Sequence, residues 1–534
     1  MVKNKLSAKE KYMFESIYDS LAREKLRDFE NDTEILANGY MERQNMASIN
    51  IRRVEKKFKD YLKEKIRDVS QTLLIADINE KRQGVFEFWD IYPDSQYQQY
   101  IDRFFEKEYY EKFISRYKLW HEKIHRIMDL GYAYLLEIVK NYLRDIDKLI
   151  AMGLLKEANE YILNELEFLG DRRNGAKCTV RCKVNNDYIM YKPESGRIYE
   201  LYGKLIRLVS GDNDYKILAM VQGNRYFWCE YARNDGCYRE RDIKEYYKNA
   251  GFMLATAYLM NAVDIQYDNI CAVGKYPVIV DAKTVSSMDF FSKSTIKEGK
   301  KEEKTVLSTS IIPRNPRKRR EKFRVHSALG DLISNEETKI EIISEFTSVA
   351  KQRRVKKRSE ELSKHLPKLG KESVPVWNYV GDVMEGFEEG YDNITKNAFK
   401  IYNLLRNYEN TKIRVMIRST KVYSKLLKML NMPDLLENKE AAGGFLEYIL
   451  RNGSMDEFSL KHEIRQLLRG DIPYFTTLLK DRTVYTEDWD RALIRRYTSC
   501  IECILSKLDQ FSEEDKKDQL DLIKSAFDWS VRYS

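Results

Sequence analysis

The stretch DIKEYYKNAGFMLATAYLMNAVDIQYDNICAVGKYPVIVDAKT, residues 242–284, decides the fold. Its first half predicts a helix long enough to be buried along one side, and this helix ends as the chain enters DIQYDN. Two short apolar runs, NICAV and YPVIV, follow with a Gly-Lys pair between them and predict a small hairpin. The second run ends on Asp281, so the stretch brings Asp264, Asn269 and Asp281 near one point.

Residues upstream of this stretch predict strands. In KCTVRCKV, residues 177–184, apolar and polar side chains alternate, and Asn185-Asn186-Asp187 supply turn chemistry. The run DYIMYK then completes a hairpin that ends at Lys192, and YFWCEYA predicts a second extended segment. The helix, the loop, the small hairpin and the acid at the end of its second strand follow one another in the order of the C-lobe of a kinase.

The rest of the chain is mostly helical in pattern. From Ser7 to about Leu163 apolar residues recur at three- and four-residue spacing with charges between them, and the same periodicity returns from about Asp331 to the end. We therefore expect a predominantly helical α+β protein. The expected parts are an N-terminal helical region (1–163), a kinase-like core (164–290), a basic, loop-like insertion (291–330) and a helical C-terminal part (331–534).

Composition limits the class of protein. The chain has 534 residues, which favours two or three subdomains around a large core. Its net charge of +9 allows nucleic acids or acidic peptides as partners without selecting either. The 7 cysteines are an odd number, the N-terminus has no apolar signal core, and no apolar run reaches the length of a membrane span. We expect a cytoplasmic protein that is not inserted in a membrane.

Transfer of phosphate from ATP needs few groups. A cation holds the phosphates, oxygen ligands hold Mg²⁺, and an acceptor orients the attacking hydroxyl. Lys192, Asn269, Asp281 and Asp264 fill these roles in that order. The chain has no GxGxxG and no Walker A motif, so the turn LGDRRNGAK, residues 169–177, is the expected substitute for a phosphate-binding loop.

Several stretches together resemble one family. In chain order they are DYIMYKPES, YFWCEYA, the residues 246–284, KTVLSTSIIP, VMEGFEEGY, RVMIRSTKVY and LLRGDIPYF, and they look like the dehydratase region of class II lanthipeptide synthetases, the LanM enzymes. The resemblance extends from roughly Leu163 to Phe475. It implies a bilobal core similar to lipid kinases, with a helical N-terminal extension and a helical C-terminal region.

The resemblance also implies a two-step reaction on a ribosomally made precursor peptide that carries a leader. ATP phosphorylates Ser or Thr side chains, and the same site then eliminates phosphate to give dehydroalanine or dehydrobutyrine. Phosphate leaves more easily than hydroxide, especially where cations stabilise its charge and a base removes the alpha proton. The implied cofactors are ATP and Mg²⁺.

The residues for phosphorylation match the family's pattern at four positions. Lys192 matches the lysine that contacts ATP, and Asp264 matches the catalytic aspartate. Asn269 and Asp281 match the Mg²⁺ ligands.

Three further residues match positions that the family associates with elimination. Arg414 and Thr420 of RVMIRST match its arginine and threonine, and Asp171 of LGDRRNG matches an acid. An arginine at the first position can hold the departing phosphate through two N–H groups.

Three positions depart from the family's pattern. Gln266 stands where the family usually has histidine, and an amide cannot carry a proton or a charge at neutral pH. Lys283 stands where an acid is usual and cannot ligate Mg²⁺. It either replaces a second metal ion by pairing with phosphate or pairs with Asp268 and marks a damaged ATP site. Arg173 stands where the family tends to have histidine.

Alternative functions follow from these departures. One is a degenerate pseudoenzyme that binds the precursor peptide or a partner synthetase, and another is a peptide kinase without elimination. Members of the family continue into a zinc-dependent cyclase domain, whereas this chain stops at Ser534, so we expect ring closure to need a separate cyclase. A reductase and an export transporter are further expected partners.

Three other motifs favour simpler interpretations. His121 to His125 read HEKIH, which matches HExxH, but the expected state is a solvated helix face because no third zinc ligand is evident. Cys500 and Cys503 are expected to be helical core residues. The run RKRR at 317–320, with Lys322 and Arg324, favours an acidic leader peptide or phosphate over nucleic acid, since no aromatic residues interleave it.

Overall fold

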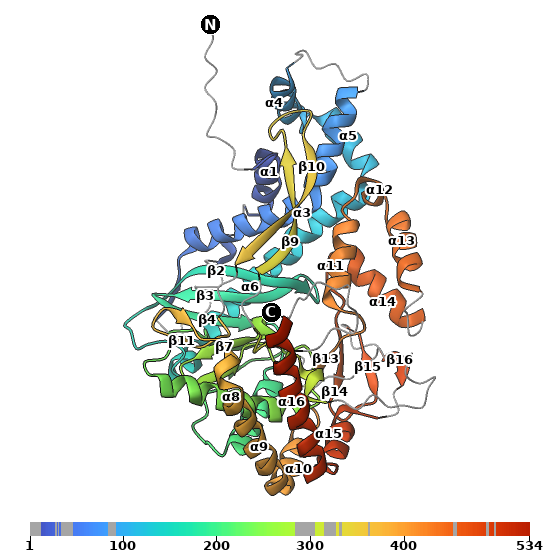
Figure 1. Cartoon of the computed structure of the whole chain (residues 1–534). Helices are drawn as coiled ribbons and strands as arrows, with labels where there is room; N and C mark the ends of the chain where they lie inside the picture. Colours follow the sequence, from blue (N-terminus) through green and yellow to red (C-terminus); the bar gives the residue numbers. More distant parts are fainter. Residues whose placement is uncertain are drawn as a thin grey trace. The chain divides into compact units, whose positions relative to one another are not determined.

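A computed structural model gives the fold of the chain (Figure 1). It describes residues 12–26, 29, 31–33, 46–83, 92–283, 305–313, 327–330, 334–360, 364–451, 457–486, 491–495 and 498–533. The basic run at 317–320, with Lys322 and Arg324, lies outside these residues. The expected mixed α+β class is confirmed, with helices as the commonest element.

The chain forms two compact units, each built from three segments. The first comprises Met1–Pro193, Thr338–Lys356 and Arg418–Pro473, and the second comprises the segments between and after these. The elements of the first unit are α1 (Glu15–Lys25), β1 (Ala47–Ile49), α3 (Ile51–Gln83), α4 (Pro93–Arg103), α5 (Lys107–Arg116), α6 (Lys118–Ala151), β2 (Tyr161–Arg173), β3 (Lys177–Val184), β4 (Asp187–Lys192), α11 (Thr420–Met429), α12 (Pro433–Leu436), α13 (Lys439–Arg451) and α14 (Glu457–Leu468).

The long helices of the first unit follow the expected periodicity. In α3 the side chains of Val54, Phe58, Leu62 and Ile66, spaced by four residues, are all fully buried. Side chains at this spacing lie on one face of a helix, so the face packs inward while the charged residues between them stay outside. Among the described residues before Tyr161, where β2 begins, the expected helices are found, and the strand β1 is an exception to the helical pattern.

The predicted hairpin that ends at Lys192 is confirmed. Strands β3 and β4 pair antiparallel, β2 pairs antiparallel with β3, and β1 adds in parallel to β2. Asn185 adopts the left-handed conformation (φ 50°) in the turn, as its residue type permits. Phe168 on β2 stacks on Tyr61 of α3 at a ring distance of 4.3 Å, which attaches the sheet to the helix.

The second unit carries the loop of the predicted site. Its elements are α7 (Arg197–Ser210), β5 (Met220–Gln222), β6 (Phe227–Glu230), α8 (Glu240–Leu259), the 3-10 turn η1 (Tyr267–Asn269), β7 (Ile270–Val273), β8 (Tyr276–Ile279), η3 (Val306–Thr309), β11 (Lys368–Leu369), β12 (Glu372–Ser373), η4 (Val376–Tyr379), α9 (Val380–Lys396), α10 (Ala398–Asn407), β13 (Lys412–Val415), β14 (Phe475–Leu478), β15 (Thr483–Tyr485), β16 (Arg491–Arg495), α15 (Cys500–Leu508) and α16 (Glu513–Tyr533).

Helices α8 and α9 touch backbone to backbone. A Cβ atom at Gly251 would lie 2.2 Å from the carbonyl oxygen of Val383, and one at Gly386 would lie 1.9 Å from that of Lys248. No side chain fits at either position. The two glycines therefore fix the position of α8, from which the loop of the site departs.

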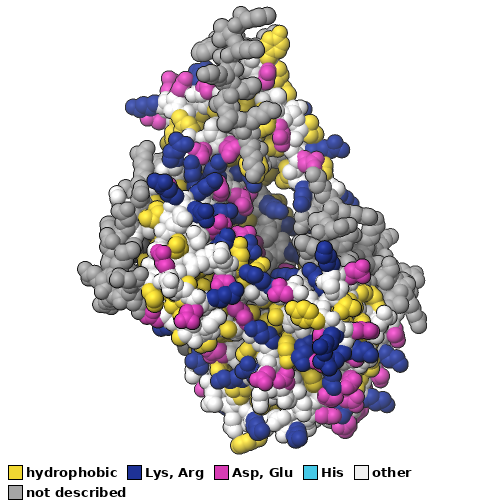
Figure 2. All heavy atoms as spheres, turned by 90° about the vertical axis from the view of Figure 1, so that its left-hand side faces the viewer, with side chains coloured by type: hydrophobic (Ala, Val, Ile, Leu, Met, Phe, Trp, Pro, Cys, Tyr) yellow, Lys and Arg dark blue, Asp and Glu magenta, His cyan; other side chains and the backbone are white. Residues whose placement is uncertain are grey.

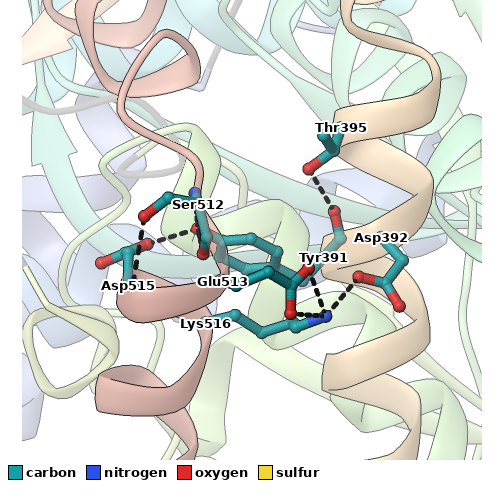
Figure 3. A network of polar contacts seen from close by, with 7 residues as sticks. All are labelled: Tyr391, Asp392, Thr395, Ser512, Glu513, Asp515 and Lys516. Atoms are coloured by element: carbon teal, nitrogen blue, oxygen red, sulfur yellow. Dashed lines mark hydrogen bonds and ion pairs between the residues drawn. The ribbon is translucent and has the colours of Figure 1, made fainter.

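Helix α16 is attached to α9 by the polar network in Figure 3. The Tyr391 hydroxyl donates to Asp515 at 2.7 Å, and the Lys516 ammonium group donates to Asp392 at 2.8 Å and to Glu513 at 3.0 Å. The side chain of Lys516 is only 11% exposed, whereas Asp392 and Glu513 are largely exposed, so the ion pairs lie at the edge of the protein surface. The network connects the last helix to the middle of the unit.

The expectation of helices from about Asp331 to the end is wrong in three places, one of which is the short antiparallel pair β11–β12. Residues 334–360 form the strands β9 (Ser334–Ile343) and β10 (Lys351–Glu360), and β13 to β16 form a four-stranded antiparallel sheet. β10 reads KQRRVKKRSE, which contains one apolar residue and so has no apolar stripe with which a helix could be buried. The strands of the second sheet are too short to show a clear period of two.

On the face drawn in Figure 2, charged side chains of both signs are interspersed with hydrophobic ones. Among the described residues, no helix combines the length and the apolar character that crossing a bilayer requires.

Candidate active site

The loop that follows α8 is held by its backbone. Asp264 adopts the left-handed conformation (φ 57°), which is unusual for a residue other than glycine and turns the chain away from the helix. The next residue, Ile265, is fully buried, and its N–H donates to the carbonyl of Thr309 at 2.9 Å. Gln266 forms an antiparallel bridge with Ser327. Two segments distant in sequence therefore fix the loop.

Asp264 is the centre of a short polar cluster. Its carboxylate accepts a hydrogen bond from the Gln266 side-chain amide, and its carbonyl accepts one from the Asn269 side-chain amide at 2.9 Å. Gln266 thus orients the carboxylate by donating an N–H. This contact needs no proton transfer, which a glutamine cannot provide.

Asn269 and Asp281 come together as the sequence predicts. The hairpin pairs Ile270 with Ile279, and beyond this pair the Asn269 carbonyl accepts the N–H groups of Val280 at 2.8 Å and Asp281 at 3.4 Å. The hairpin therefore places the amide and the acid side by side at its open end.

Lys283 lies between two carboxylates. Its ammonium nitrogen is 3.3 Å from Asp281 Oδ2 and 3.6 Å from Glu194 Oε1, and its side chain is 16% exposed. The Tyr199 hydroxyl donates to Glu194 at 3.3 Å and to Asp281 at 3.4 Å. Burial raises the pKa of Tyr199 well above its usual value, so the hydroxyl stays a donor at neutral pH.

Lys283 pairs with Asp281 and Glu194 and not with Asp268, the partner considered from the sequence. Asp268 is exposed and forms no ion pair among the described residues, whereas Asp281 and Glu194 do pair with Lys283. Sequence reasoning missed Glu194 and Tyr199. Glu194 lies two residues after Lys192 in YKPES, and that closeness to a predicted phosphate-binding residue was the available signal.

His365 is a second residue that sequence reasoning missed. It is 5% exposed, its ring lies 5.7 Å from that of Tyr267 in the loop, and its carbonyl accepts the Tyr246 hydroxyl at 2.6 Å. Burial lowers the pKa of His365 to about 4, so its imidazole is neutral at pH 7. No sequence pattern relates a histidine about a hundred residues away to the loop.

The donor set fits one Mg²⁺ ion better than two. Mg²⁺ at nucleotide sites takes one or two protein oxygens and completes its shell with phosphates and water. Asn269 and Asp281 offer such oxygens. The ammonium group of Lys283 stands 3.3 Å from Asp281 and already supplies a positive charge beside that acid. Among the described residues no three His, Cys, Asp or Glu side chains form a metal-binding group.

Lys192 and Asp171 belong to the first unit. Lys192 ends β4 and is 5% exposed, so its charge lies inside the protein. Asp171 lies near the end of β2, with its carboxylate 4.0 Å from the guanidinium of Arg173. Arg173 therefore forms a loose ion pair with Asp171 at the position where a histidine would match the resemblance.

The turn at 174–176 does not offer a free phosphate-binding loop. Asn174, Gly175 and Ala176 are all left-handed, and the N–H groups of Gly175 and Ala176 both donate to the Asp471 carboxylate, at 2.9 and 3.1 Å. Asp471 is fully buried and comes from the motif LLRGDIPYF. A protein carboxylate thus already occupies the N–H groups that were expected to bind phosphate.

Thr420 and Arg414 lie in different units. Thr420 is the first residue of α11 in the first unit. Nearby, the Arg418 guanidinium donates to Glu463 at 2.9 Å and to the Leu450 carbonyl at 2.8 Å, and Tyr423 also donates to Glu463. We call Arg418, Tyr423 and Glu463 the buried cluster. It fixes the start of α11 and with it the backbone of Thr420.

Arg414 lies on β13 in the second unit and is 8% exposed. It stands opposite Thr476 on β14 in the antiparallel register. A buried guanidinium of this kind needs anionic or carbonyl partners. Its position within a regular strand makes it a rigid group.

The remaining motifs lie in helices. His125 is exposed on α6, and its Nε2 atom is 3.0 Å from that of His121, so the pair lies on the solvent side of the helix. Cys500 is buried in α15, and Cys503 is partly buried in the same helix. These positions agree with a solvated helix face and with core cysteines.

Comparison with known proteins finds a family model and a relative that match the chain. Residues 117–478 match a family described as a domain of unknown function, DUF4135. The chain is also 23% identical over 492 residues to the lacticin 481/lactococcin biosynthesis protein LcnDR2 of Lactococcus lactis subsp. lactis. The match includes 87% of this chain and 52% of that protein, so the chain spans about half the length of the relative.

Proposed function

Because the chain belongs to the DUF4135 family, which occurs in LanM-type lanthipeptide synthetases, we propose that it is an ATP-dependent dehydratase of peptide Ser and Thr residues. The observation that carries the proposal is the grouping of Asp264, Asn269 and Asp281 around one loop and hairpin. The substrate is a ribosomally made precursor peptide. The order of helix, loop and hairpin in the second unit supports a core similar to lipid kinases.

The first step is phosphorylation. Asp264 accepts a hydrogen bond from the Ser or Thr hydroxyl and orients its oxygen toward the terminal phosphorus of ATP. The new bond forms between that oxygen and phosphorus, the bond to ADP breaks, and the hydroxyl proton leaves to Asp264 or water. Asn269 and Asp281 hold Mg²⁺, which neutralises phosphate charge when bound. Lys192 holds the phosphates, and Lys283 adds a fixed cation.

The second step is elimination. A base removes the alpha proton, the electron pair forms the double bond, and the carbon–oxygen bond to phosphate breaks. Arg414 holds the departing phosphate, with Thr420 and Asp171 as further groups of this step. The products are dehydroalanine or dehydrobutyrine and inorganic phosphate, so the overall change is loss of one water from each site at the expense of ATP.

Mass spectrometry of a precursor peptide after incubation with the protein, ATP and Mg²⁺ tests the proposal. We expect products lighter by one water per modified residue. Asp264→Asn should slow phosphorylation about 10²–10⁴-fold, because it removes the acceptor for the hydroxyl, and dehydration should slow with it because elimination needs the phosphorylated residue. Asp268→Asn is the matched control: it removes an exposed acid from the same loop and should dehydrate the peptide like the wild type.

The elimination residues give a separate outcome. Arg414→Met and Thr420→Ala should accumulate the heavier phosphorylated peptide, because they leave the loop of the second unit unchanged. A wild-type protein that yields only the heavier peptide would instead be a peptide kinase without elimination. If Asp264→Asn dehydrates at the wild-type rate, the role of the loop is wrong.

One observation favours a second candidate, a pseudoenzyme that binds the precursor peptide or a partner synthetase. Lys283 pairs with both Asp281 and Glu194 and so neutralises acids that would otherwise attract a metal ion. Calorimetry with Mg-ATP separates the two candidates. Binding of ATP that requires Mg²⁺ supports the dehydratase. If ATP does not bind, the function as a pseudoenzyme that binds the peptide or a partner synthetase is the one supported. A separate cyclase or reductase and an export transporter remain proposed partners under either function.

A further inference from the structure

The hairpin of β9 and β10 is attached to helix α3. The Asn79 side-chain amide donates to the carbonyl of Ala350 at 3.0 Å, and the Gln352 amide donates to the Thr72 hydroxyl at 3.1 Å. Both helix residues lie in the first unit, together with hairpin residues 338–356. These contacts are made by β10 at its start. They leave Gln352 facing the helix.

The segment that connects the two strands is attached to α4. The Ser348 N–H donates to the carbonyl of Pro93 at 2.8 Å, and the Phe346 ring meets the Tyr97 ring edge to face at 5.9 Å. The hairpin is therefore held at its turn and at the start of β10. A strand held in this way is pre-organised for binding, because little conformational entropy remains to be lost.

β10 presents cations to solvent. Lys351, Arg353 and Arg354 are exposed, and none of them forms an ion pair among the described residues. Successive side chains of a strand point to opposite faces, so Lys351 and Arg353 share the face opposite Gln352. Along a strand, residues two apart are separated by about 6.6–6.8 Å. The charges of Lys351 and Arg353 are thus separated by the same distance as two alternate side chains of a neighbouring strand.

The sheet formed by β9 and β10 has two strands among the described residues, and its outer edges pair with no other described strand. Such an edge carries N–H and C=O groups that can pair with another chain. Ile340 and Ile343 of β9 are 54% and 46% exposed, so apolar contact area accompanies the charges. The hairpin is drawn in Figure 1 as two long adjacent arrows, β9 and β10.

We propose that the edge of β10 binds an acidic, extended segment of the peptide substrate by adding it as a further strand. Main-chain hydrogen bonds supply affinity, and carboxylates at alternate positions of the segment face Lys351 and Arg353. The proposal rests on the proposed function for the identity of the peptide. It adds the place where the peptide is held and the charge pattern that is recognised.

Fluorescence anisotropy with short labelled peptides tests the proposal in the absence of ATP. One peptide alternates Glu with Val, and a second has the same composition with its glutamates in one block. We expect the alternating peptide to bind more tightly, and increasing salt to weaken binding. The double variant Lys351→Glu/Arg353→Glu should weaken binding about tenfold or more, because opposite charges become like charges.

A matched control reverses two exposed cations elsewhere in the first unit. Arg52→Glu/Lys56→Glu on α3 changes the net charge by the same amount and should leave affinity within about twofold, since long-range fields are screened by salt. Circular dichroism and thermal unfolding verify that both double variants fold. Equal losses of affinity in the two variants would mean attraction by net charge alone and would overturn the proposal.

N-methylation of the alternating peptide tests strand addition. A strand added to an edge uses the N–H groups of every second residue. Methylation of the N–H groups that face the protein should therefore abolish binding, and methylation of the alternate N–H groups, which face away, should preserve it. Loss of binding with both methylated peptides or with neither contradicts strand addition. Since the assay contains no ATP, absence of binding beside normal dehydration would overturn only this inference, and binding without dehydration would overturn only the dehydratase.

Discussion

Two ion-pair networks of the molecule each combine a cation, carboxylate groups and a tyrosine hydroxyl, and they differ in their exposure to water. In the buried cluster of the first unit, Glu463 is fully buried and accepts from Arg418 and Tyr423. In the second unit, Lys283 joins Asp281 and Glu194, Tyr199 donates to both acids, and the Asp281 side chain is 35% exposed. The first network has no group left to offer a ligand. The second keeps a partly exposed carboxylate, Asp281, beside the loop that follows α8.

This difference in exposure suggests how an ion pair that stabilises the fold can be distinguished from one that is available to a ligand. A buried pair is costly to break because the remaining charge stays in a medium of low polarity. A network with an exposed acid can exchange a partner for water or a metal ion. Substitutions in the first network should therefore act on stability, and those in the second should act on Mg²⁺ and ATP.

The largest expected effect is that of Glu463→Ala. It leaves Arg418 buried without its carboxylate, so the free energy of unfolding should fall by about 3–5 kcal/mol. Urea denaturation measures the change. Glu447→Ala, which removes the exposed partner of Arg451 on α13, is the control and should cost about 0–1 kcal/mol. Equal losses in the two variants would show that burial does not distinguish these pairs.

His365 adds a pH dependence to the second unit. Its folded pKa, about 4, lies below the unfolded value of 6.5, so the unfolded chain binds the extra proton between these values. This contribution to stability is present above pH 6.5 and is lost as pH falls toward 4. It should amount to about 2 kcal/mol between pH 7 and pH 5.

Urea denaturation of the wild type and His365→Phe at both pH values measures this contribution. The variant keeps an aromatic ring beside Tyr267 but cannot titrate, so its stability should fall less between pH 7 and pH 5. If the two proteins lose equal stability over this interval, the histidine is not the group that titrates.

The smallest expected change is that of Glu194→Gln, which should lower the free energy of unfolding by about 1 kcal/mol. Lys283 keeps Asp281 as its partner, and the carbonyl oxygen of the new glutamine still accepts the hydrogen bond from Tyr199. Its effect should appear in the Mg²⁺ requirement. With one acid neutralised, Lys283 binds Asp281 more strongly and competes with the metal ion, so half-maximal ATP turnover should need more Mg²⁺. If the variant needs less Mg²⁺, or no Mg²⁺ at all, for half-maximal ATP turnover, the claim that the second network acts on Mg²⁺ is wrong.

Much of the second unit could be predicted from the sequence because its signals are local. The helix α8, the loop and the hairpin β7–β8 occupy one continuous stretch, and spacing alone brings Asn269 and Asp281 together. The expected hairpin β3–β4 is likewise formed by residues that are neighbours in sequence. In each case the turn is short and the alternation of apolar residues is clear.

Contacts between distant segments were not predictable in this way. Asp471 binds a turn about three hundred residues earlier, and His365 packs against a loop about a hundred residues before it. Neither residue has a spacing that signals its partner. The charged strand β10 was also missed. Its side chains are nearly all polar, as is typical of an exposed edge strand, and so they lack the alternation of apolar and polar residues that marks a half-buried strand.

The contact between Gly251 and Gly386 limits how such a site can diverge. With no room for even a methyl group between α8 and α9, neither helix can slide or rotate without separating from the other. The backbone that carries the loop therefore cannot move without separating the two helices. Its chemistry can change only through substitution of single side chains on the loop and hairpin. Gln266 and Lys283 are exchanges of this kind, and they are therefore the positions at which substitution would test the proposed requirement for Mg²⁺ without moving the backbone.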